Sequence, residues 1–206
     1  MAIKPILFNT EMVRAILDGR KTCTRRICKD ASEYTVPDMN FYNAEKRTYA
    51  VHNFADREHT EKLSIAERTC PICPGDILYV RETWLDYAGR TMYRADCDKY
   101  RLESLKLAGF SWKPSIHMPK EAARIWLRVT DVRVEQLREI TPQGAWKEGA
   151  RCSCLHPVPD CAGNKTAFIE IWNSTIKKSD IDRYGWDASP WVWVIEFERC
   201  EKPEGV

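Results

Sequence analysis

Two segments of alternating hydrophobicity constrain the fold of this 206-residue chain most strongly. In the first, "ARIWLRVTDVRVEQL" (123–137), apolar residues alternate as far as Val129, two polar residues interrupt the phase, and Val132 resumes it. In the second, "WVWVIEFERC" (191–200), large apolar residues recur at every other position. A period of two predicts strands, and a slipped phase indicates a bulge or bend of the kind that curved sheets need. The chain is therefore expected to be built on a small curved sheet.

The remaining patterns add further strands and several helices. A strand is expected at 77–84 ("ILYVRETW") after the turn "PGD", with "TMYRA" (91–95) as its antiparallel partner. Helices are expected at 10–19, at 141–149 with Thr141 as N-cap before Pro142, and at 166–177. Residues 29–68 are polar and mixed, which predicts a surface excursion with one hairpin and a weak strand at 42–51. Together these predict an α+β fold, a small and mostly antiparallel barrel with helices outside it.

Charge and composition exclude some classes of protein. Thirty-two Lys and Arg face 30 Asp and Glu, a net charge of +2, so any argument for nucleic-acid binding has to be local. No apolar stretch is long enough for a signal peptide or a membrane span, which predicts a cytoplasmic protein without a membrane partner. No phosphate-binding loop, GxSxG elbow or HExxH pair is present, and no cofactor is expected.

Nine cysteines without a secretion signal are expected to be thiols rather than disulfides. They gather in two places, at Cys70 and Cys73 in "CPICPGD" and in "CSCLHPVPDC", which holds Cys152, Cys154 and Cys161 with His156 among them. A zinc site at Cys70, Cys73, Cys152 and Cys154 is the alternative to free thiols, although the second cluster lacks the regular CxxC spacing.

The stretch "GRKTCTRRI" (19–27) concentrates positive charge around two threonines. Thr24 can act as a nucleophile if a base removes its proton, and Lys21 can be that base because Arg20, Arg25 and Arg26 disfavour its protonated form. A spacing of three brings the two side chains together in a helical turn but not in a regular strand. A solvated or interaction face is the alternative.

A second group of candidate residues follows the strand expected at 77–84. Glu82 falls on an otherwise apolar face, so it should pair with a cation such as Arg26 or Lys21, or have a raised pKa. Arg81 and Trp84 could hold a base or phosphate by a guanidinium fork and stacking, with core packing as the alternative for Trp84. His117 lies in a loop, where it is a candidate for the rim of a pocket.

The chain resembles a known family in several blocks. "GRKTCTRR", "PGDILYVRE", "AWKEGA" and "WVWVIEFE" are similar to ASCH domains, PUA-like barrels related to RNA-binding domains. The G-x-K-T-x-T-x-R pattern resembles that of the small bacterial acetylcytidine amidohydrolases, while "VRETW" and "HMP" resemble longer ASCH proteins of phages and prophages. The resemblance implies one domain over 1–206, with a polar insertion at about 29–68 and a helical insertion at about 150–190.

The resemblance also implies a function. It points to RNA, DNA or a modified nucleoside as the partner in a cationic cleft, and to hydrolysis of an N-acyl amide on a cytidine-like base by Lys21, Thr24 and Glu148. Glu82 is a second candidate carboxylate. Three alternatives stay open: a nonhydrolytic nucleic-acid reader, a ribonuclease using Lys21, Arg26 and Glu82, and a phage assembly protein without catalysis. The sequence gives no indication of the oligomeric state.

Overall fold

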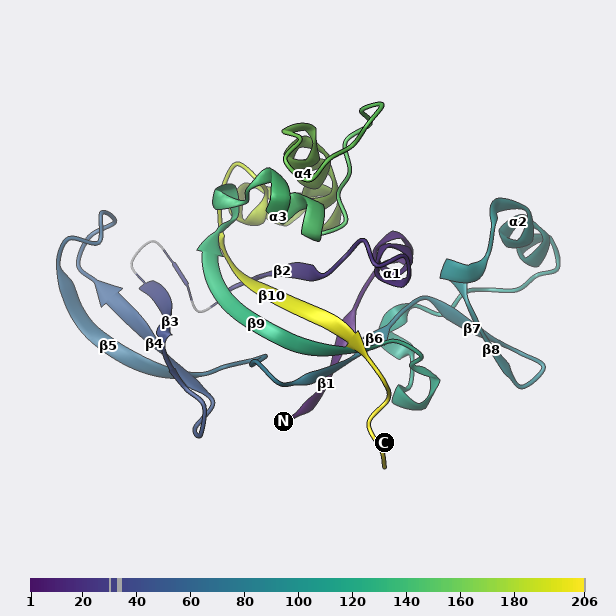
Figure 1. Cartoon of the computed structure of the whole chain (residues 1–206), viewed down its shortest axis with the longest axis horizontal. Coiled ribbons are helices and arrows are strands. Elements are labelled where there is room, and N and C mark those ends of the chain that lie inside the picture. The colour runs from purple at the N-terminus through teal and green to yellow at the C-terminus, as the bar shows by residue number, and fades with distance from the viewer. Residues whose placement is uncertain (30, 33–34, 206) are drawn as a thin grey trace. The chain divides into compact units, whose positions relative to one another are not determined.

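The computed structural model describes residues 1–29, 31–32 and 35–205. The chain forms two compact units. Unit 1 comprises Met1–Thr22, Gly75–Val129 and Phe197–Val206, and unit 2 comprises Cys23–Pro74 and Thr130–Glu196. Two long strands, β9 (Trp126–Gln136) and β10 (Trp191–Cys200), run through both (Figure 1). The single domain expected from the sequence stays a prediction.

The principal sheet has five strands in the order β1-β6-β9-β10-β2. β1 (Ile3–Leu7) pairs in parallel with β6 (Ile77–Arg81), and β6 is antiparallel to β9. At the other edge, β2 (Cys23–Ile27) is antiparallel to β10. The predicted α+β, mostly antiparallel class is confirmed, but the sheet is open, because β1 and β2 end it as edge strands of five residues each. A closed barrel would need ladder hydrogen bonds between those edges.

The burial pattern of β9 follows the slipped phase in the sequence. Val129 and Val132 are buried, whereas Thr130 and Asp131 between them are both exposed. A strand that stayed in phase would bury one of those two positions. The predicted slip is therefore real, and a single strand of 11 residues accommodates it.

Unit 1 differs from the sequence expectation at residues 77–84. The predicted strand is two strands, because β6 ends at Arg81 and β7 (Trp84–Tyr87) begins after Glu82 and Thr83. β8 (Arg90–Tyr93) pairs with β7, not with β6. The same unit contains α1 (Thr10–Leu17), which Asn9 caps by accepting the N–H of Met12, and α2 (Lys99–Leu107). Short 3₁₀ turns complete it, at Arg94–Asp96, Ser115–His117 and Lys120–Ala122.

The polar excursion is more structured than expected. It forms a three-stranded antiparallel sheet of β3 (Thr35–Asn43), β4 (Thr48–Phe54) and β5 (Lys62–Thr69). The weak strand expected at 42–51 is wrong, since a turn between β3 and β4 lies inside it. Tyr49 of β4 is fully buried and meets Trp193 edge-on at 5.0 Å between ring centres. A few apolar residues therefore anchor a sheet whose remaining sequence is polar.

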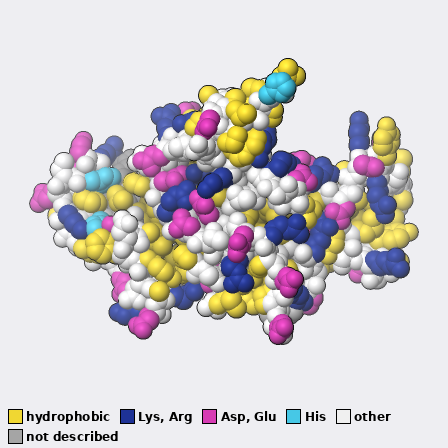
Figure 2. All heavy atoms as spheres, viewed as in Figure 1, with side chains coloured by type: hydrophobic (Ala, Val, Ile, Leu, Met, Phe, Trp, Pro, Cys, Tyr) yellow, Lys and Arg dark blue, Asp and Glu magenta, His cyan; other side chains and the backbone are white. Residues whose placement is uncertain are grey.

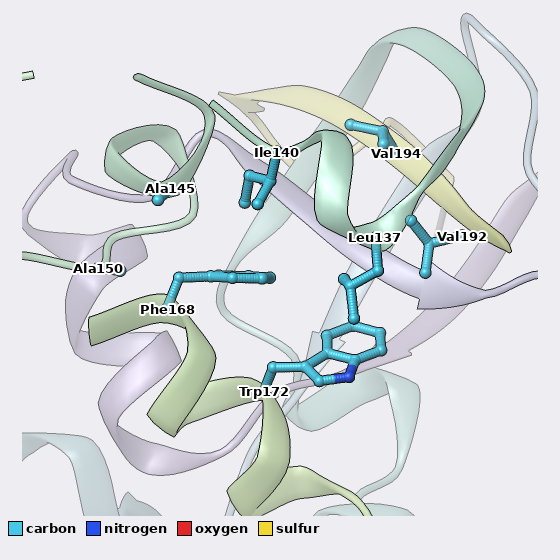
Figure 3. Close-up of a cluster of buried hydrophobic side chains, with 8 residues drawn as sticks. All are labelled: Leu137, Ile140, Ala145, Ala150, Phe168, Trp172, Val192 and Val194. Atoms are coloured by element: carbon cyan, nitrogen blue, oxygen red, sulfur yellow. The ribbon is translucent and has the colours of Figure 1, made fainter. Parts of the chain in front are cut away.

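Helices of unit 2 form its apolar core around β10. α3 (Pro142–Lys147) has the predicted Thr141 cap, and α4 (Gly163–Thr175) begins three residues before the expected helix. A 3₁₀ turn follows β9 at Leu137–Glu139, and another at Lys178–Asp180 leads into α5 (Ile181–Tyr184). Figure 3 shows Phe168 and Trp172 of α4 lying against the side chains of the core cluster: Leu137, Ile140, Ala145, Ala150, Val192 and Val194.

None of the described helices is long and apolar enough to cross a membrane.

Candidate functional site

The cationic segment enters the principal sheet as its edge strand β2. Gly19 adopts a positive φ of 70° after α1, and the N–H of Lys21 donates to the carbonyl of Ala15. Within β2, Thr24 is opposite Ile195 and Arg26 is opposite Trp193. Successive strand residues point to opposite faces, so Thr24 and Arg26 share one face of β2 and Arg25 lies on the other.

Arg25 is held by two carboxylates. Its guanidinium donates to Glu135 (Nε–Oε1 3.0 Å) and to Glu148 (Nη1–Oε1 3.2 Å), and lies 5.8 Å from the centre of the Phe168 ring. Burial by itself would lower the pKa of Arg25, but Glu148, Cys23 and Glu135 together raise it. Its side chain is 2% exposed, so this arginine is a compensated structural cation rather than a free ligand-binding group.

Arg26 lines a cavity of about 310 Å³, named here the β2 cavity. Its volume is at the lower end of the range for small-molecule sites. Trp193 and Ile195 of β10 and Val132 of β9 supply apolar walls, Lys29 adds a second cation, and the lining is completed by Ile27, Pro71 and Ile72. The cavity thus combines one indole, two cations and an apolar lining.

The electrostatics of Arg26 differ from those of Arg25. Burial lowers the pKa of Arg26, and the attraction of Glu148 only partly opposes this effect. The surroundings therefore disfavour the charged guanidinium on balance. A ligand that brings negative charge or electron-rich oxygens to this face would reduce that cost.

A second, larger cavity of about 760 Å³, the outer cavity, shares Ile27 and Lys29 with the β2 cavity. Arg183 and Tyr184 of α5 and Trp191 of β10 are among its lining residues. The guanidinium of Arg183 lies 5.0 Å from the centre of the Tyr184 ring. Two adjoining hollows in unit 2 therefore present cations interleaved with aromatic rings.

Lys21 and Thr24 are both buried, with exposed fractions of 2% and 1%. Lysines are almost never this buried unless they are paired. The ammonium of Lys21 lies 5.6 Å from the centre of the Phe8 ring, which packs against Phe197. Thr24 belongs to strand β2, whereas Lys21 precedes it, so the stretch is a loop leading into a strand and not one helical turn. Their joint action stays a prediction.

Glu82 has a partner that the sequence reading did not name. Its carboxylate accepts from Nε and Nη2 of Arg124 at 2.9 and 3.1 Å, and Arg124 also donates to Asp96. Burial raises the pKa of Glu82, even though Arg124 acts in the opposite direction. The centre of the Tyr93 ring lies 3.9 Å from the guanidinium carbon of Arg124. Glu82 is buried as predicted, and its carboxylate forms an ion pair with Arg124 in unit 1.

The other candidates in unit 1 are dispersed. Arg81 donates to the carbonyl of Met118, Trp84 is a core residue with the ammonium of Lys113 4.6 Å from its ring centre, and His117 is exposed on a 3₁₀ turn. Arg20 pairs with Asp18 at 2.8 Å. These contacts explain the positions of Arg81, Trp84 and Arg20 without a ligand, and they favour the core reading of Trp84.

The two cysteine groups have different surroundings. Cys70 and Cys73 are buried, and their thiols lie near backbone carbonyls of Ile72 and Cys70. The sulfurs of the second group, Cys152, Cys154 and Cys161, lie within 4.8 Å of one another. Within the described part of the chain, this is the one group of three or more potential metal ligands found together. The four-cysteine set considered from the sequence is thus not assembled as a single group.

The sequence reading missed several lining residues of the two cavities. The sequence predicts Trp191 and Trp193 only as residues of a strand, and it places Lys29 in the polar excursion and Arg183 in the helical insertion without a role for either. What these residues share is their place in the fold, because they line the cavities beside the cationic strand only once β10 has paired with β2. No local motif marks them.

No family model matches the chain, and no curated protein matches it. Among solved structures, the chain is similar to the ASCH domain from Lactobacillus crispatus JV V101, with 10% sequence identity and a TM-score of 0.41. The similarity covers 96% of this chain and 79% of that one. At this level of similarity, the function has to be argued from the residues of the site itself.

Proposed function

We propose that this protein binds a nucleoside or a short single-stranded nucleic acid, with a base in the β2 cavity and a phosphate in the outer cavity. The observation that carries the proposal is that Arg26 and Trp193, which are opposite each other on β2 and β10, both line the β2 cavity of about 310 Å³. Lys29 lines both the β2 cavity and the outer cavity. Indole rings and guanidinium groups offer flat surfaces on which bases stack, and lysines and arginines neutralise phosphates. The sequence resemblance to ASCH domains supports the same ligand class.

Binding can be measured with unmodified nucleosides, N-acylated cytidine and a fluorescein-labelled single-stranded RNA of eight nucleotides. We expect Arg26→Gln to weaken binding at least about fivefold, because losing one stacking or charged contact costs roughly 1–3 kcal/mol. Arg68→Gln is the matched control, since Arg68 is exposed on β5 and makes the same charge change. Absence of binding to every probe, or equal losses in the two variants, would rule out the β2 cavity as the site.

Hydrolysis of an N-acyl amide is a second candidate function. Thr24 lies on the same face of β2 as Arg26, and its strand partner Ile195 lines the cavity, which favours a nucleophile near a bound base. The sequence pattern adds Lys21 as base and Glu148 as the accompanying carboxylate. In this function, Thr24 would attack the acyl carbon while Lys21 takes its proton and passes it to the nitrogen of the leaving base. Water would then hydrolyse the acyl-threonine ester and release the carboxylic acid.

Release of acetate from N-acetylated cytidine, followed by mass, tests the enzyme reading. We expect turnover to disappear in Thr24→Ala and in Lys21→Ala and to persist in Thr22→Ala, because Thr22 is exposed two residues earlier and carries the same substitution. RNA incubated in parallel with and without a chelator detects a nuclease. Binding without turnover in either assay would indicate a nucleic-acid-binding protein that is not an enzyme. If the protein shows no binding and no turnover, the result favours an assembly role.

A further inference from the structure

Three cysteine sulfurs converge in the connection between α3 and α4. Cys152 and Cys154 follow α3, and Cys161 comes two residues before α4 begins at Gly163. Their Sγ atoms all lie within 4.8 Å of one another, and those of Cys154 and Cys161 are 3.5 Å apart. Eight residues lie between the first cysteine and the last, so the loop has to fold back on itself to bring the sulfurs together. Figure 1 shows this connection as the green loop between the two helices.

A buried asparagine fixes the loop in this folded-back form. Asn164, in the first turn of α4, has no exposed surface. Its Oδ1 accepts the N–H of Cys152 at 3.0 Å, and its Nδ2 donates to the carbonyls of Val158 and Pro159 at 2.8 and 3.1 Å. One side chain therefore holds both arms of the loop. Since these hydrogen bonds satisfy the buried amide, they also preorganise the three cysteines.

Gly163 allows the helix to start directly against the sulfurs. A Cβ at this position would lie 2.7 Å from Cβ of Cys152, 3.6 Å from Sγ of Cys161 and 3.8 Å from Sγ of Cys154. The first of these distances is too short for any side chain without a backbone shift. The residue is thus required by close approach to the cluster, because its φ lies outside the left-handed range.

The spacing of the sulfurs fits a tetrahedral metal better than the alternatives. Zinc–thiolate bonds of about 2.3 Å place tetrahedral ligand sulfurs roughly 3.8 Å apart. A disulfide brings two sulfurs to about 2.05 Å and gives no role to the third. Core packing is also a poor explanation, because Cys154 is exposed and the other two are half-buried, whereas Cys23, Cys28, Cys70, Cys73 and Cys97 are buried.

We propose that Cys152, Cys154 and Cys161 bind one zinc ion as thiolates, with a fourth ligand from outside the three cysteines. Binding releases the thiol protons to solvent and involves no change of oxidation state. The ion would tie the start of α4 to the end of α3, and α4 carries Phe168 and Trp172 into the core shown in Figure 3. The site is independent of the nucleic-acid function proposed above.

Metal content and cobalt spectroscopy test the proposal on the full chain. We expect protein purified without chelator and under reducing conditions to contain one equivalent of zinc. The metal-free protein should bind one equivalent of Co²⁺ with the thiolate-to-cobalt and tetrahedral ligand-field absorption bands. Cys152→Ser and Cys161→Ser should each weaken Co²⁺ binding by at least about tenfold. Cys200→Ser is the matched control and should bind like the wild type, because Cys200 lies at the end of β10.

A measurement on the unmodified protein guards against variants that fail to fold. Zinc should protect three thiols of the native wild type from a thiol reagent, and a chelator should make all three thiols reactive again. The proposal is overturned if the wild type shows no thiolate-to-cobalt band at saturating Co²⁺. It is equally overturned if no thiols are protected, if Cys200→Ser loses binding as the other variants do, or if the reduced preparation contains a Cys154–Cys161 disulfide.

Discussion

At the scale of single residues, the buried charged side chains of Arg25 and Glu82 show opposite electrostatic outcomes. In unit 2, two carboxylates overcome the burial of Arg25, so that its pKa is raised. In unit 1, burial outweighs the bidentate contact of Arg124 with Glu82, so that the pKa of Glu82 is raised. A charge removed from water is stabilised only when its partners fully replace the lost hydration. Removing one partner of such a buried pair should therefore lower the free energy of unfolding more than the exposed fraction of the removed side chain suggests.

We expect Arg124→Ala to lower the free energy of unfolding by roughly 3 kcal/mol, because it leaves Glu82 buried without this cation. Arg128→Ala should cost under about 1 kcal/mol, since the Arg128 side chain is 50% exposed and lies 3.8 Å from Glu198. Urea unfolding of the two variants makes the comparison. Equal losses of unfolding free energy in the two variants would show that the buried Glu82–Arg124 pair stabilises the fold no more than an exposed pair does.

The raised pKa of Glu82 predicts in which direction the free energy of unfolding changes with pH. Between the ordinary carboxyl pKa of about 4.3 and the raised value, the folded state binds more protons than the unfolded state, so stability falls as the pH rises. Glu82→Gln has no such titration. The difference in unfolding free energy, wild type minus Glu82→Gln, should therefore decline from pH 4 upward. A difference that grows with pH would contradict the predicted direction.

At the scale of elements, short caps determine where charged groups are presented. The Thr141 hydroxyl accepts the N–H of Gly144 at 3.0 Å and starts α3, whose C-cap residue Glu148 lies beside Arg25. Gly149 then adopts a φ of 88°, which permits the chain to leave the helix. A helix of six residues has little stability of its own, so the cap and the packing have to maintain it.

Thr141→Ala should reduce the free energy of unfolding by about 1 kcal/mol, because one N–H of the first turn loses its acceptor. Thr141→Ser keeps a hydroxyl and should stay close to the wild type. Thermal or urea unfolding distinguishes the two substitutions. If serine and alanine are equally destabilising, the loss comes from the threonine methyl group and its packing.

At the scale of the whole molecule, the charge is nearly balanced, and acidic and basic side chains are intermixed. Figure 2 shows Lys and Arg next to Asp and Glu over the region of β9 and β10, where Arg133, Lys147 and Glu196 form salt bridges. A net charge of +2 creates no strong field over the molecule. Nucleic-acid binding should therefore depend on a few local cations.

We expect a correspondingly shallow salt dependence for the single-stranded RNA. Each phosphate neutralised contributes roughly −0.7 to the slope of log K against log salt concentration. Arg183→Gln should reduce the slope by about that amount, and Arg68→Gln should leave it unchanged. Anisotropy titrations at several salt concentrations measure it. A steep slope that Arg183→Gln does not alter would place the phosphates elsewhere.

Local patterns predicted the elements that depend on neighbouring residues. The cap of α3, the phase slip in β9 and the strand β10 were predictable, because cap chemistry and side-chain period act over a few positions. The three strands in the polar excursion and the break after β6 were not predicted. Tyr49 is buried by Trp193, more than a hundred residues away, and no local period records that contact.

The sequence by itself determined the α+β class, the burial of Glu82 and the concentration of charge around Lys21 and Thr24. Only the tertiary structure decided which carboxylates hold Arg25, that Arg124 pairs with Glu82, and that Arg26 lies opposite Trp193 at a cavity. It also brought three irregularly spaced cysteines together. The reason is physical: a charge or thiol takes its properties from whatever packing places within a few ångströms, and strand pairing chooses those neighbours from distant parts of the chain.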